Sequence, residues 1–290
     1  MMSRPNGSAV SRETPLPAPS QTRTIVIVNQ KGGVGKTTTA VNIASALARG
    51  GLNVLLMDLD PQGNASTALG VRHQSGVPGT YEVLLQQATI AEVLQASPES
   101  ERLAVVPATI DLAGAEIELV PQVAREQRLR KAVTTHLTSQ EVDYVIFDCP
   151  PSLGLLTLNA LVAANEILMP IQCEYYALEG VSHLLRTIDI VRDELNPTLE
   201  VGTVLLTMYD ARTKLSAQVG AQVREYFPDQ TLLTLIPRSV RLSEAPSYGQ
   251  TILGYDPQSV GAKAYRRAAQ EIAERGARVP VGAGSAGEYR

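Results

Sequence analysis

Short runs of almost wholly apolar residues alternate with longer amphipathic stretches along most of the chain. The runs are rich in Val, Ile and Leu and lack the strict alternation of a half-exposed strand, so they predict strands buried on both faces of a sheet. We expect such strands at residues 24–29, 53–60, 103–108, 142–148, 166–171, 201–209 and 230–237. Helices are predicted at 37–51, 179–195 and 259–275, together with a mostly helical stretch at 112–137 that is broken near Pro121.

This alternation predicts an α/β fold with a mostly parallel, twisted sheet and helices on both of its faces. No internal repeat or linker interrupts residues 24–276, which we therefore expect to form a single domain. Residues 1–23 are rich in Pro, Ser and Thr and predict a disordered N-terminal arm, and the Gly-rich residues 277–290 predict a flexible tail.

Composition limits the class of protein. Of the 290 residues, 44% are hydrophobic and 19% are charged, as in ordinary globular proteins. The two cysteines form no Cys-x-x-Cys pair, which argues against a structural zinc site and favours a reducing cytoplasm. We find neither an apolar run near the roughly 20 residues that span a bilayer nor the apolar core of a signal peptide, and we expect no membrane partner.

Charge is unevenly distributed along the chain. Residues 24–207 carry 20 acidic and 11 basic side chains, a net charge of −9, whereas residues 208–278 carry 7 acidic and 10 basic ones, a net charge of +3. The C-terminal third is therefore where a surface for a polyanion is expected.

The strongest chemical signal is NQKGGVGKTTT at residues 29–39, between a predicted strand and a predicted helix. A loop at that position directs backbone N–H groups toward an anion at a helix N-terminus. Lys36 supplies a charge for the β- and γ-phosphates, and the Thr37 hydroxyl is a ligand for Mg²⁺. The other phosphate-binding positions are Gly32, Gly33, Val34, Gly35 and Thr38. The first glycine of the common P-loop is replaced by Gln30, and a second lysine, Lys31, follows it.

The sequence KGGVGKTT at residues 31–38, with its additional lysine, resembles the deviant Walker A motif of the ParA/MinD superfamily of P-loop ATPases. The resemblance runs over residues 24–275 through four further segments: DLDPQGNAS after the second strand, VIFDCPPSLG around Asp148, LTMYDARTKLS at 206–216 and IPRSVRLSEAPSYGQ at 236–250. Together they look like the chromosomal ParA (Soj) branch of DNA-partition ATPases. The resemblance implies a P-loop NTPase type of fold, with ATP and Mg²⁺ as cofactors.

The resemblance also implies site roles. Asp148 corresponds to the Walker B carboxylate that holds Mg²⁺ through water, and Asp58 lies near the metal. Asp60 orients or activates the attacking water, and Lys36 and Lys31 complete the catalytic set. In the family, the position of Lys31 reaches across an ATP-dependent sandwich homodimer to the phosphates of the other subunit. The positions of Met208 and Pro237 border the adenine.

The function implied is weak intrinsic ATP hydrolysis that switches non-specific binding to double-stranded DNA, stimulated by a ParB-type centromere-binding protein. The protein would then be cytoplasmic and nucleoid-associated. Arg238 and Arg241 lie in a matching motif and are the expected DNA contacts, with Lys263 as a further candidate. Arg212, Lys214, Arg266 and Arg267 add to the local positive charge, although basic residues on a terminal helix commonly form only a solvated face.

Other functions in the superfamily remain open or are disfavoured. A ParA-like ATPase that positions a protein cargo shares the same motifs and stays open. A MinD-like membrane-positioning ATPase needs a C-terminal amphipathic helix, which residues 279–290 do not resemble. An electron-transfer ATPase needs cysteines from both subunits to hold a shared iron–sulfur cluster. Cys149, which follows Asp148, is better explained as a small buried residue at the end of a strand. The 23 residues before Thr24 are too few for a helix-turn-helix domain.

Overall fold

The computed structural model describes residues 15–175, 177 and 179–277. Within this part of the chain, one sheet has the strand order β3-β4-β2-β5-β1-β6-β7-β8. All neighbouring strands are parallel except β3, which pairs with β4 in the antiparallel sense. The strands are β1 (Arg23–Ile27), β2 (Val54–Asp58), β3 (Gln95–Ala96), β4 (Leu103–Val106), β5 (Tyr144–Asp148), β6 (Glu166–Gln172), β7 (Glu200–Tyr209) and β8 (Thr231–Pro237). The predicted α/β fold with a mostly parallel sheet is confirmed.

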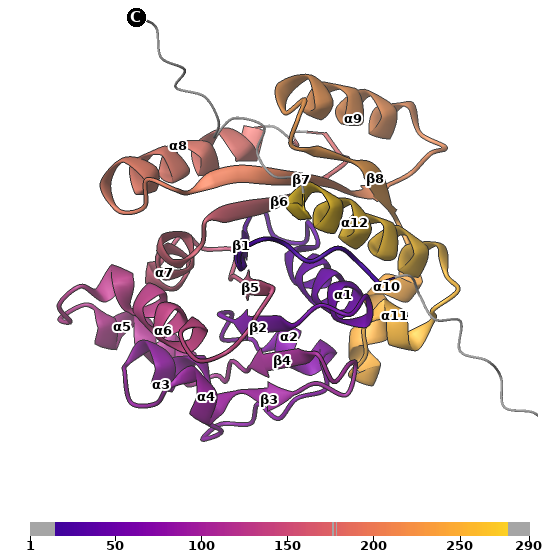
Figure 1. Cartoon of the computed structure of the whole chain (residues 1–290). Helices are drawn as coiled ribbons and strands as arrows, with labels where there is room; N and C mark the ends of the chain where they lie inside the picture. Colours follow the sequence, from indigo (N-terminus) through magenta and orange to yellow (C-terminus); the bar gives the residue numbers. More distant parts are fainter. Residues whose placement is uncertain (1–14, 176, 178, 278–290) are drawn as a thin grey trace, which may run out of the picture.

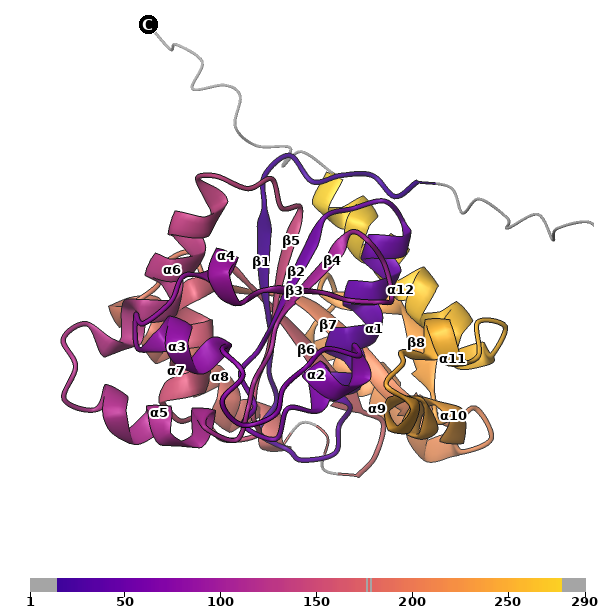
Figure 2. The same cartoon turned by 90° about the horizontal axis from the view of Figure 1, so that it is seen from below.

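Helices cover both faces of this sheet (Figures 1 and 2). The first face carries α3 (Thr80–Leu84), α4 (Ile90–Val93), α5 (Leu112–Leu119), α6 (Arg128–Leu137), α7 (Leu155–Ala163), α8 (Glu179–Glu194) and α9 (Lys214–Tyr226). The second carries α1 (Lys36–Arg49), α2 (Asn64–Ala68), α10 (Val240–Glu244), α11 (Ile252–Tyr255) and α12 (Val260–Ala277). Two 3₁₀ turns, η1 (Arg125–Gln127) and η2 (Ala245–Tyr248), complete the structure.

Two hydrophobic cores lie on the two sides of the sheet. Successive side chains of β1 alternate between them: Val26 belongs to the core of the first face, whereas Ile25 and Ile27 belong to the core of the second. Both faces of the central strands are thus covered, which explains why these strands are apolar at every position.

Some elements lie outside the predicted set. No helix was predicted for α2, which begins in the segment after β2, and neither α7 nor α9 was predicted. The stretch 112–137 does break near Pro121, into α5, η1 and α6. The two-residue strand β3 is too short to leave a hydrophobic pattern.

The segment that precedes β1 lies against the second face. Leu16 packs on the core beneath α1, and its N–H donates a hydrogen bond to the carbonyl of Gly50 (2.9 Å). The hydroxyl of Thr22 donates to the carbonyl of Val142 (2.6 Å). Part of the expected arm, residues 15–22, is therefore in contact with the domain, while residues 1–14 and the tail from 278 onward lie outside the described residues.

Glu99, in the loop between β3 and β4, connects the start of α11 to α1. Its carboxylate accepts hydrogen bonds from the Ser45 hydroxyl (2.9 Å), the Arg49 guanidinium (2.8 Å) and the N–H of Thr251 (2.9 Å). Its side chain is only 4% exposed. Burial acts to raise the pKa of Glu99, but the hydrogen bonds from Thr251 and Arg49 outweigh burial and hold this pKa below its usual value of 4.5.

We expect Glu99→Ala to lower the free energy of unfolding by about 3 kcal/mol at pH 7, because it leaves Arg49 and the Thr251 N–H without their acceptor. Because the pKa is lower in the folded state, the stability that Glu99 adds is complete above its unfolded pKa and is lost as pH falls through the folded value. The stability difference between wild type and Glu99→Gln, measured by urea unfolding, should therefore narrow on acidification. A difference that stays constant from neutral pH down to pH 4 would contradict this.

Candidate nucleotide-binding site

The loop between β1 and α1 forms an anion cradle at the carboxyl edge of the sheet. Gly33 and Gly35 have positive φ angles of 75° and 90°, and Gly35 is the N-cap of α1 with no side-chain capping bond. The first N–H groups of α1 are therefore available to a ligand. No atom lies within 4 Å of a Cβ placed on Gly32 or Gly33, so the space above the loop is open.

Lys36, the first residue of α1, is buried beside the acidic strand ends, with 8% of its surface exposed. Burial lowers the pKa of Lys36, while the carboxylates of Asp148 and Asp60 oppose this shift. A partly desolvated ammonium group gains more from a phosphate than an exposed one does, because the effective dielectric constant around it is lower.

Asp58 and Asp148 end the neighbouring strands β2 and β5 and are partners in their register. Both are fully buried. Asp58 accepts hydrogen bonds from the N–H (2.9 Å) and the hydroxyl (2.7 Å) of Ser66. Burial raises the pKa of Asp58 to about 7, although the hydrogen bonds from Ser66 act to lower it. Burial, and then repulsion from Asp58, raise the pKa of Asp148 well above its usual range.

The residues around Asp148 fit a magnesium ion that arrives with a nucleotide. Both carboxylate oxygens of Asp148 are buried and have no hydrogen-bond partner among the described residues, and the Thr37 hydroxyl is close enough to lower the pKa of Asp148. The described residues contain no group of three or more His, Cys, Asp or Glu side chains placed to hold a metal. Mg²⁺ suits such a site, since it keeps several waters and takes few carboxylates plus phosphate oxygens.

A cavity of about 360 Å³ adjoins the loop. Gly35 and Thr38 line it from the loop side, and the two residues expected near an adenine, Met208 and Pro237, line it from the ends of β7 and β8. Its remaining lining residues are Thr207, Ile236, Arg238, Ser239, Val240, Leu242, Ser243 and Tyr265. The cavity is thus shared by the phosphate loop and the segment that follows β8.

Several site residues were missed by the sequence analysis. Thr207 donates a hydrogen bond to the carbonyl of Val34 (2.8 Å) and so supports the loop from β7. Ser66 holds Asp58, as described above. Asn29 accepts a hydrogen bond from the N–H of Lys31 (3.0 Å). These contacts join chemically common residues, and no local pattern distinguishes them.

Asp60 and Lys31 occupy different environments. Asp60 is 9% exposed and accepts a hydrogen bond from the N–H of Gln62 (3.0 Å), and its charge acts on both Lys36 and Asp148. Lys31 is exposed at the start of the loop. The structure therefore brings Asp60 into the buried cluster and leaves Lys31 on the surface.

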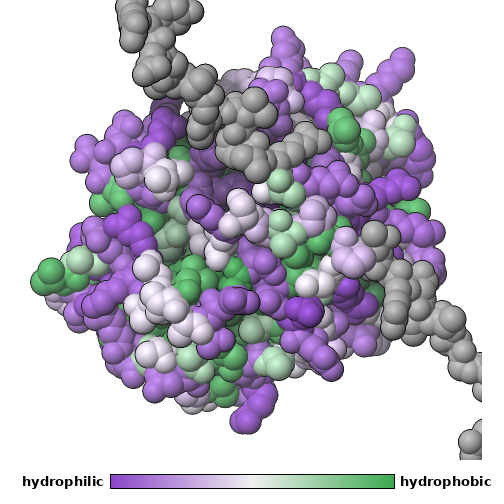
Figure 3. All heavy atoms as spheres, viewed as in Figure 1, coloured by the Kyte–Doolittle hydropathy of each residue, from purple (hydrophilic) through white to green (hydrophobic). Residues whose placement is uncertain are grey.

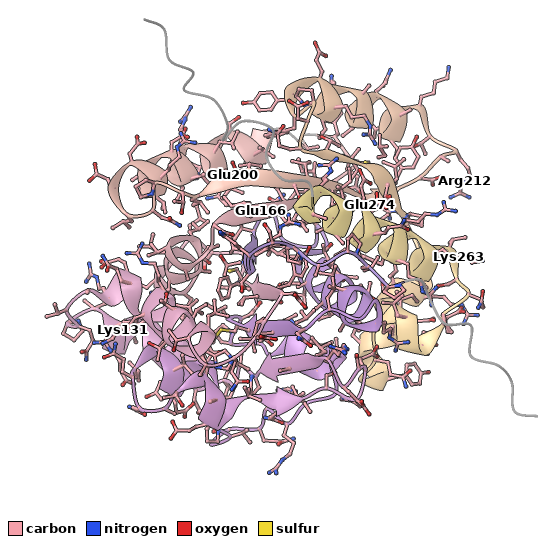
Figure 4. The ribbon with its side chains drawn as sticks, in the orientation of Figure 1. Lys131, Glu166, Glu200, Arg212, Lys263 and Glu274 are labelled. Atoms are coloured by element: carbon pink, nitrogen blue, oxygen red, sulfur yellow. The ribbon has the colours of Figure 1, made fainter. Side chains whose placement is uncertain are left out.

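The basic residues expected to contact DNA are exposed. Arg238 pairs with Glu174 (2.5 Å) and is 58% exposed, and Arg241 pairs with Asp256 (3.3 Å) and is 59% exposed. Lys263 is exposed on α12, on the same side of the molecule as Arg212 in Figure 4. Arg238 also lines the cavity beside the phosphate loop.

Asn42 connects the first turn of α1 to α11. Its Nδ2 donates to the carbonyl of Thr38 (2.7 Å), and its Oδ1 accepts from the N–H of Ile252 (2.9 Å). The side chain is 3% exposed. Asn42 therefore joins the phosphate-binding end of α1 to the residues that follow η2.

Cys149 is fully buried, and burial raises the pKa of its thiol well above the usual range. A thiol in this state is a poor nucleophile. In the part of the chain that the structure describes, no helix combines the length and the apolar character that crossing a bilayer requires.

Comparison with known proteins identifies relatives over most of the chain. The family model of an AAA domain matches residues 22–201. The sporulation initiation inhibitor protein Soj of Bacillus subtilis is 53% identical over 252 residues, covering 87% of this chain and 98% of the relative. The chromosome-partitioning ATPase Soj of Treponema pallidum is 49% identical over 253 residues, covering 87% of this chain and 98% of the relative.

Solved structures with a similar fold include a synthase crystallised with ADP and a cell division ATPase. A cobyrinic acid a,c-diamide synthase from Mycobacterium smegmatis, crystallised with ADP and magnesium, is 40% identical with a TM-score of 0.74, over 86% of this chain and 93% of that one. The cell division ATPase MinD of Pyrococcus furiosus is 25% identical with a TM-score of 0.71, over 87% of this chain and 99% of that one.

Proposed function

Because the chain belongs to the Soj/ParA family of chromosome-partitioning ATPases, we propose that it is a DNA-binding switch operated by ATP. Binding of ATP with Mg²⁺ produces a homodimer, the dimer binds double-stranded DNA without sequence preference, and hydrolysis releases it. A ParB-type protein at a centromere stimulates that hydrolysis. The protein is then cytoplasmic and associated with the nucleoid.

The phosphate loop and the acidic strand ends supply the parts of the ATPase. The N–H groups of Gly32 to Thr38 and the ammonium group of Lys36 bind the phosphates, and the adenine occupies the cavity lined by Met208 and Pro237. Thr37 and Asp148 would hold Mg²⁺, with Asp58 near it. At that position Mg²⁺ would supply positive charge that offsets the charge of the phosphates.

Hydrolysis needs an oriented water in this arrangement. Asp60 orients the water that attacks the γ-phosphate, so that the bond from the γ-phosphorus to the β-bridging oxygen breaks and ADP and phosphate leave. Its position in the buried cluster beside Lys36 supports this role. Phosphoryl transfer depends on positioning and charge neutralisation more than on covalent chemistry, which suits a slow enzyme that a partner accelerates.

Lys31 provides the link to a second subunit. It is exposed, and the hydrogen bond from its N–H to Asn29 fixes its backbone at the mouth of the loop. From there it reaches the phosphates bound by the other protomer. A γ-phosphate contacted by two subunits couples dimerisation to the presence of that phosphate.

One observation carries the DNA part of the proposal. The cavity beside the phosphate loop is lined by Arg238 and by the start of α10, and Arg241 lies in the same short helix. The segment that holds the exposed arginines is therefore in direct contact with the nucleotide cavity. A change of nucleotide acts on the position of these arginines without any intervening element.

The test is binding of a non-specific DNA duplex to full-length protein without nucleotide, with ADP–Mg²⁺ and with ATP–Mg²⁺. Asp60→Ala holds the ATP state, and Lys31→Ala removes the contact between subunits. Binding that requires ATP, fails in Lys31→Ala and weakens steeply with salt would support the proposal. ATP-dependent dimers that bind no DNA in any state would overturn the DNA part, and would favour a protein or membrane-associated cargo.

We expect Arg241→Glu to weaken duplex binding by about tenfold or more and to reduce the slope of log K against log salt by about one. ATP turnover without DNA should be unchanged, because Arg241 does not line the nucleotide cavity. The matched control is Lys131→Glu, a charge reversal at an exposed position on α6. If both variants bind DNA alike, the proposed surface is wrong.

A further inference from the structure

Two hollows adjoin each other across α6, on the opposite face of the sheet from α1 and α12. The first, of about 430 Å³, lies between α6 and the α3–α4 segment. The second, of about 610 Å³, lies between α6 and the loop that follows α5. They share the lining residues Gln86, Arg128, Lys131 and Thr135, and we call the combined feature the α6 groove. None of its lining residues borders the nucleotide cavity.

A polar atom that has no partner lies along this groove. The Nε of Arg128 is buried and makes no hydrogen bond with any described residue. His136 lines the first hollow, and 7% of its surface is exposed. Unpartnered buried polar groups of this kind are uncommon in folded proteins, and they mark positions where a ligand or water completes the bonding.

The groove also carries a net positive charge, since three basic residues and one acidic residue line it. Arg128 donates only to neutral acceptors, the carbonyl of Leu84 (3.4 Å) and Oε1 of Gln122 (3.0 Å), and Arg130 donates to the carbonyl of Leu195 (3.1 Å). Neither these arginines nor Lys131 forms an ion pair within the described part of the chain.

One acidic residue, Glu92, lines the first hollow. Its carboxylate accepts hydrogen bonds from the N–H (2.7 Å) and the hydroxyl (2.8 Å) of Thr89, so it stays ionised and offsets one of the three positive charges. The groove is thus a basic feature within the part of the chain, residues 24–207, whose net charge is −9.

Apolar residues lie on both sides of the cationic centre. Val83 and Ile90 line the first hollow and are each 1% exposed, and the partly exposed Ala132 lines it as well. Val123 lines the second and is 88% exposed, and Figure 3 shows hydrophobic surface at the left edge of the molecule, over the end of α5. A ligand that crosses α6 would therefore meet apolar contacts on either side of Arg128 and Lys131.

We propose that the α6 groove binds an acidic peptide segment of a partner protein. Carboxylate side chains of the peptide bond to Arg128, Lys131 and His136, and flanking aliphatic side chains pack against Val123 and into the first hollow. Charge complementarity and the two-part shape support an extended peptide. Duplex DNA does not match apolar hollows that enclose a buried histidine. The site is separate from the nucleotide cavity, so it does not depend on the proposed DNA switch.

The test uses full-length protein and a short fluorescein-labelled peptide of alternating leucine and glutamate, with binding followed by anisotropy. A second peptide with glutamine in place of every glutamate measures the contribution of charge. The variants are Lys131→Glu and its matched control Lys263→Glu, two exposed lysines on opposite sides of the molecule in Figure 4. Thr135→Trp fills the groove at an exposed position without changing its charge.

Lys131→Glu and Thr135→Trp should each weaken binding by about tenfold or more, while Lys263→Glu changes it by less than about twofold. The glutamine peptide should bind about tenfold more weakly than the glutamate peptide. The proposal is overturned if Lys263→Glu weakens binding as much as Lys131→Glu, if the two peptides bind alike, or if no saturable binding occurs. It is also overturned if Lys131→Glu weakens duplex DNA binding, which would make the groove a DNA contact.

Discussion

Lys36→Ala is expected to abolish ATP binding while the protein stays folded. The ammonium group of Lys36 is partly desolvated beside Asp148 and Asp60, so its bonds to phosphate oxygens are stronger than those of an exposed lysine. We expect the loss of these bonds to weaken ATP binding by about a thousandfold, which corresponds to a loss of about 4 kcal/mol of binding free energy. The measurement is titration with a fluorescent ATP analogue in the presence of Mg²⁺.

The fold should survive this change because alanine favours a helix more than any other residue, so α1 is kept. Asp58 also keeps its hydrogen bonds from the N–H and the hydroxyl of Ser66. The melting temperature without nucleotide should stay close to that of wild type, and only the increase on adding ATP should disappear. Lys214→Ala, at an exposed lysine of α9, is the matched control. An ATP affinity within about threefold of wild type would exclude the proposed role of Lys36.

Asp60→Ala is expected to lower ATP turnover by about 10²- to 10⁴-fold, the range that a positioned acid–base group contributes. ATP affinity should change little, since the negatively charged Asp60 is not among the groups that bind the phosphates and its carboxylate accepts a hydrogen bond from the N–H of Gln62. The ATP-bound dimer should then accumulate and stay on DNA. Single-turnover hydrolysis with radiolabelled ATP measures the chemical step, and light scattering measures the dimer.

The matched variant Asp60→Asn separates chemistry from structure. Asparagine keeps an oxygen that accepts the hydrogen bond from the Gln62 N–H, yet it lacks the charge that orients a water. Turnover should fall in Asp60→Asn about as far as in Asp60→Ala. Should either variant lose nucleotide binding as Lys36→Ala does, Asp60 would belong to the binding site and not to the hydrolysis step.

The strands and the phosphate loop were predictable because their causes are local. A strand covered on both faces must be apolar at every position, as Ile25, Val26 and Ile27 are. The loop needs glycine where φ is positive, as at Gly33 and Gly35. Each requirement leaves a pattern within a few consecutive residues.

Other parts of the structure have causes that lie far away in the sequence. Helix α7 is apolar on most of its surface because it packs between the sheet and its neighbours, so it lacks the helical periodicity that reveals an amphipathic helix. Thr207 supports the loop at Val34 from a strand 173 positions away. Ser66 becomes important only because Asp58 is buried beside it. The charged members of the site are therefore recognisable in the sequence, whereas the neutral residues that hold them are not.

The hydrogen bonds of Asn42 and Glu99 fix one end of the segment between β8 and α11. The N–H of Thr251 is held by Glu99 (2.9 Å) and the N–H of Ile252 by Asn42 (2.9 Å). At the other end, the N–H of Arg238 donates to the carbonyl of Tyr209 (3.1 Å) at the edge of the sheet. Because hydrogen bonds hold both ends, any movement of this segment in response to nucleotide takes place between residues 238 and 251. The backbone of Arg238 is thereby anchored, whereas Arg241 lies between the two fixed ends.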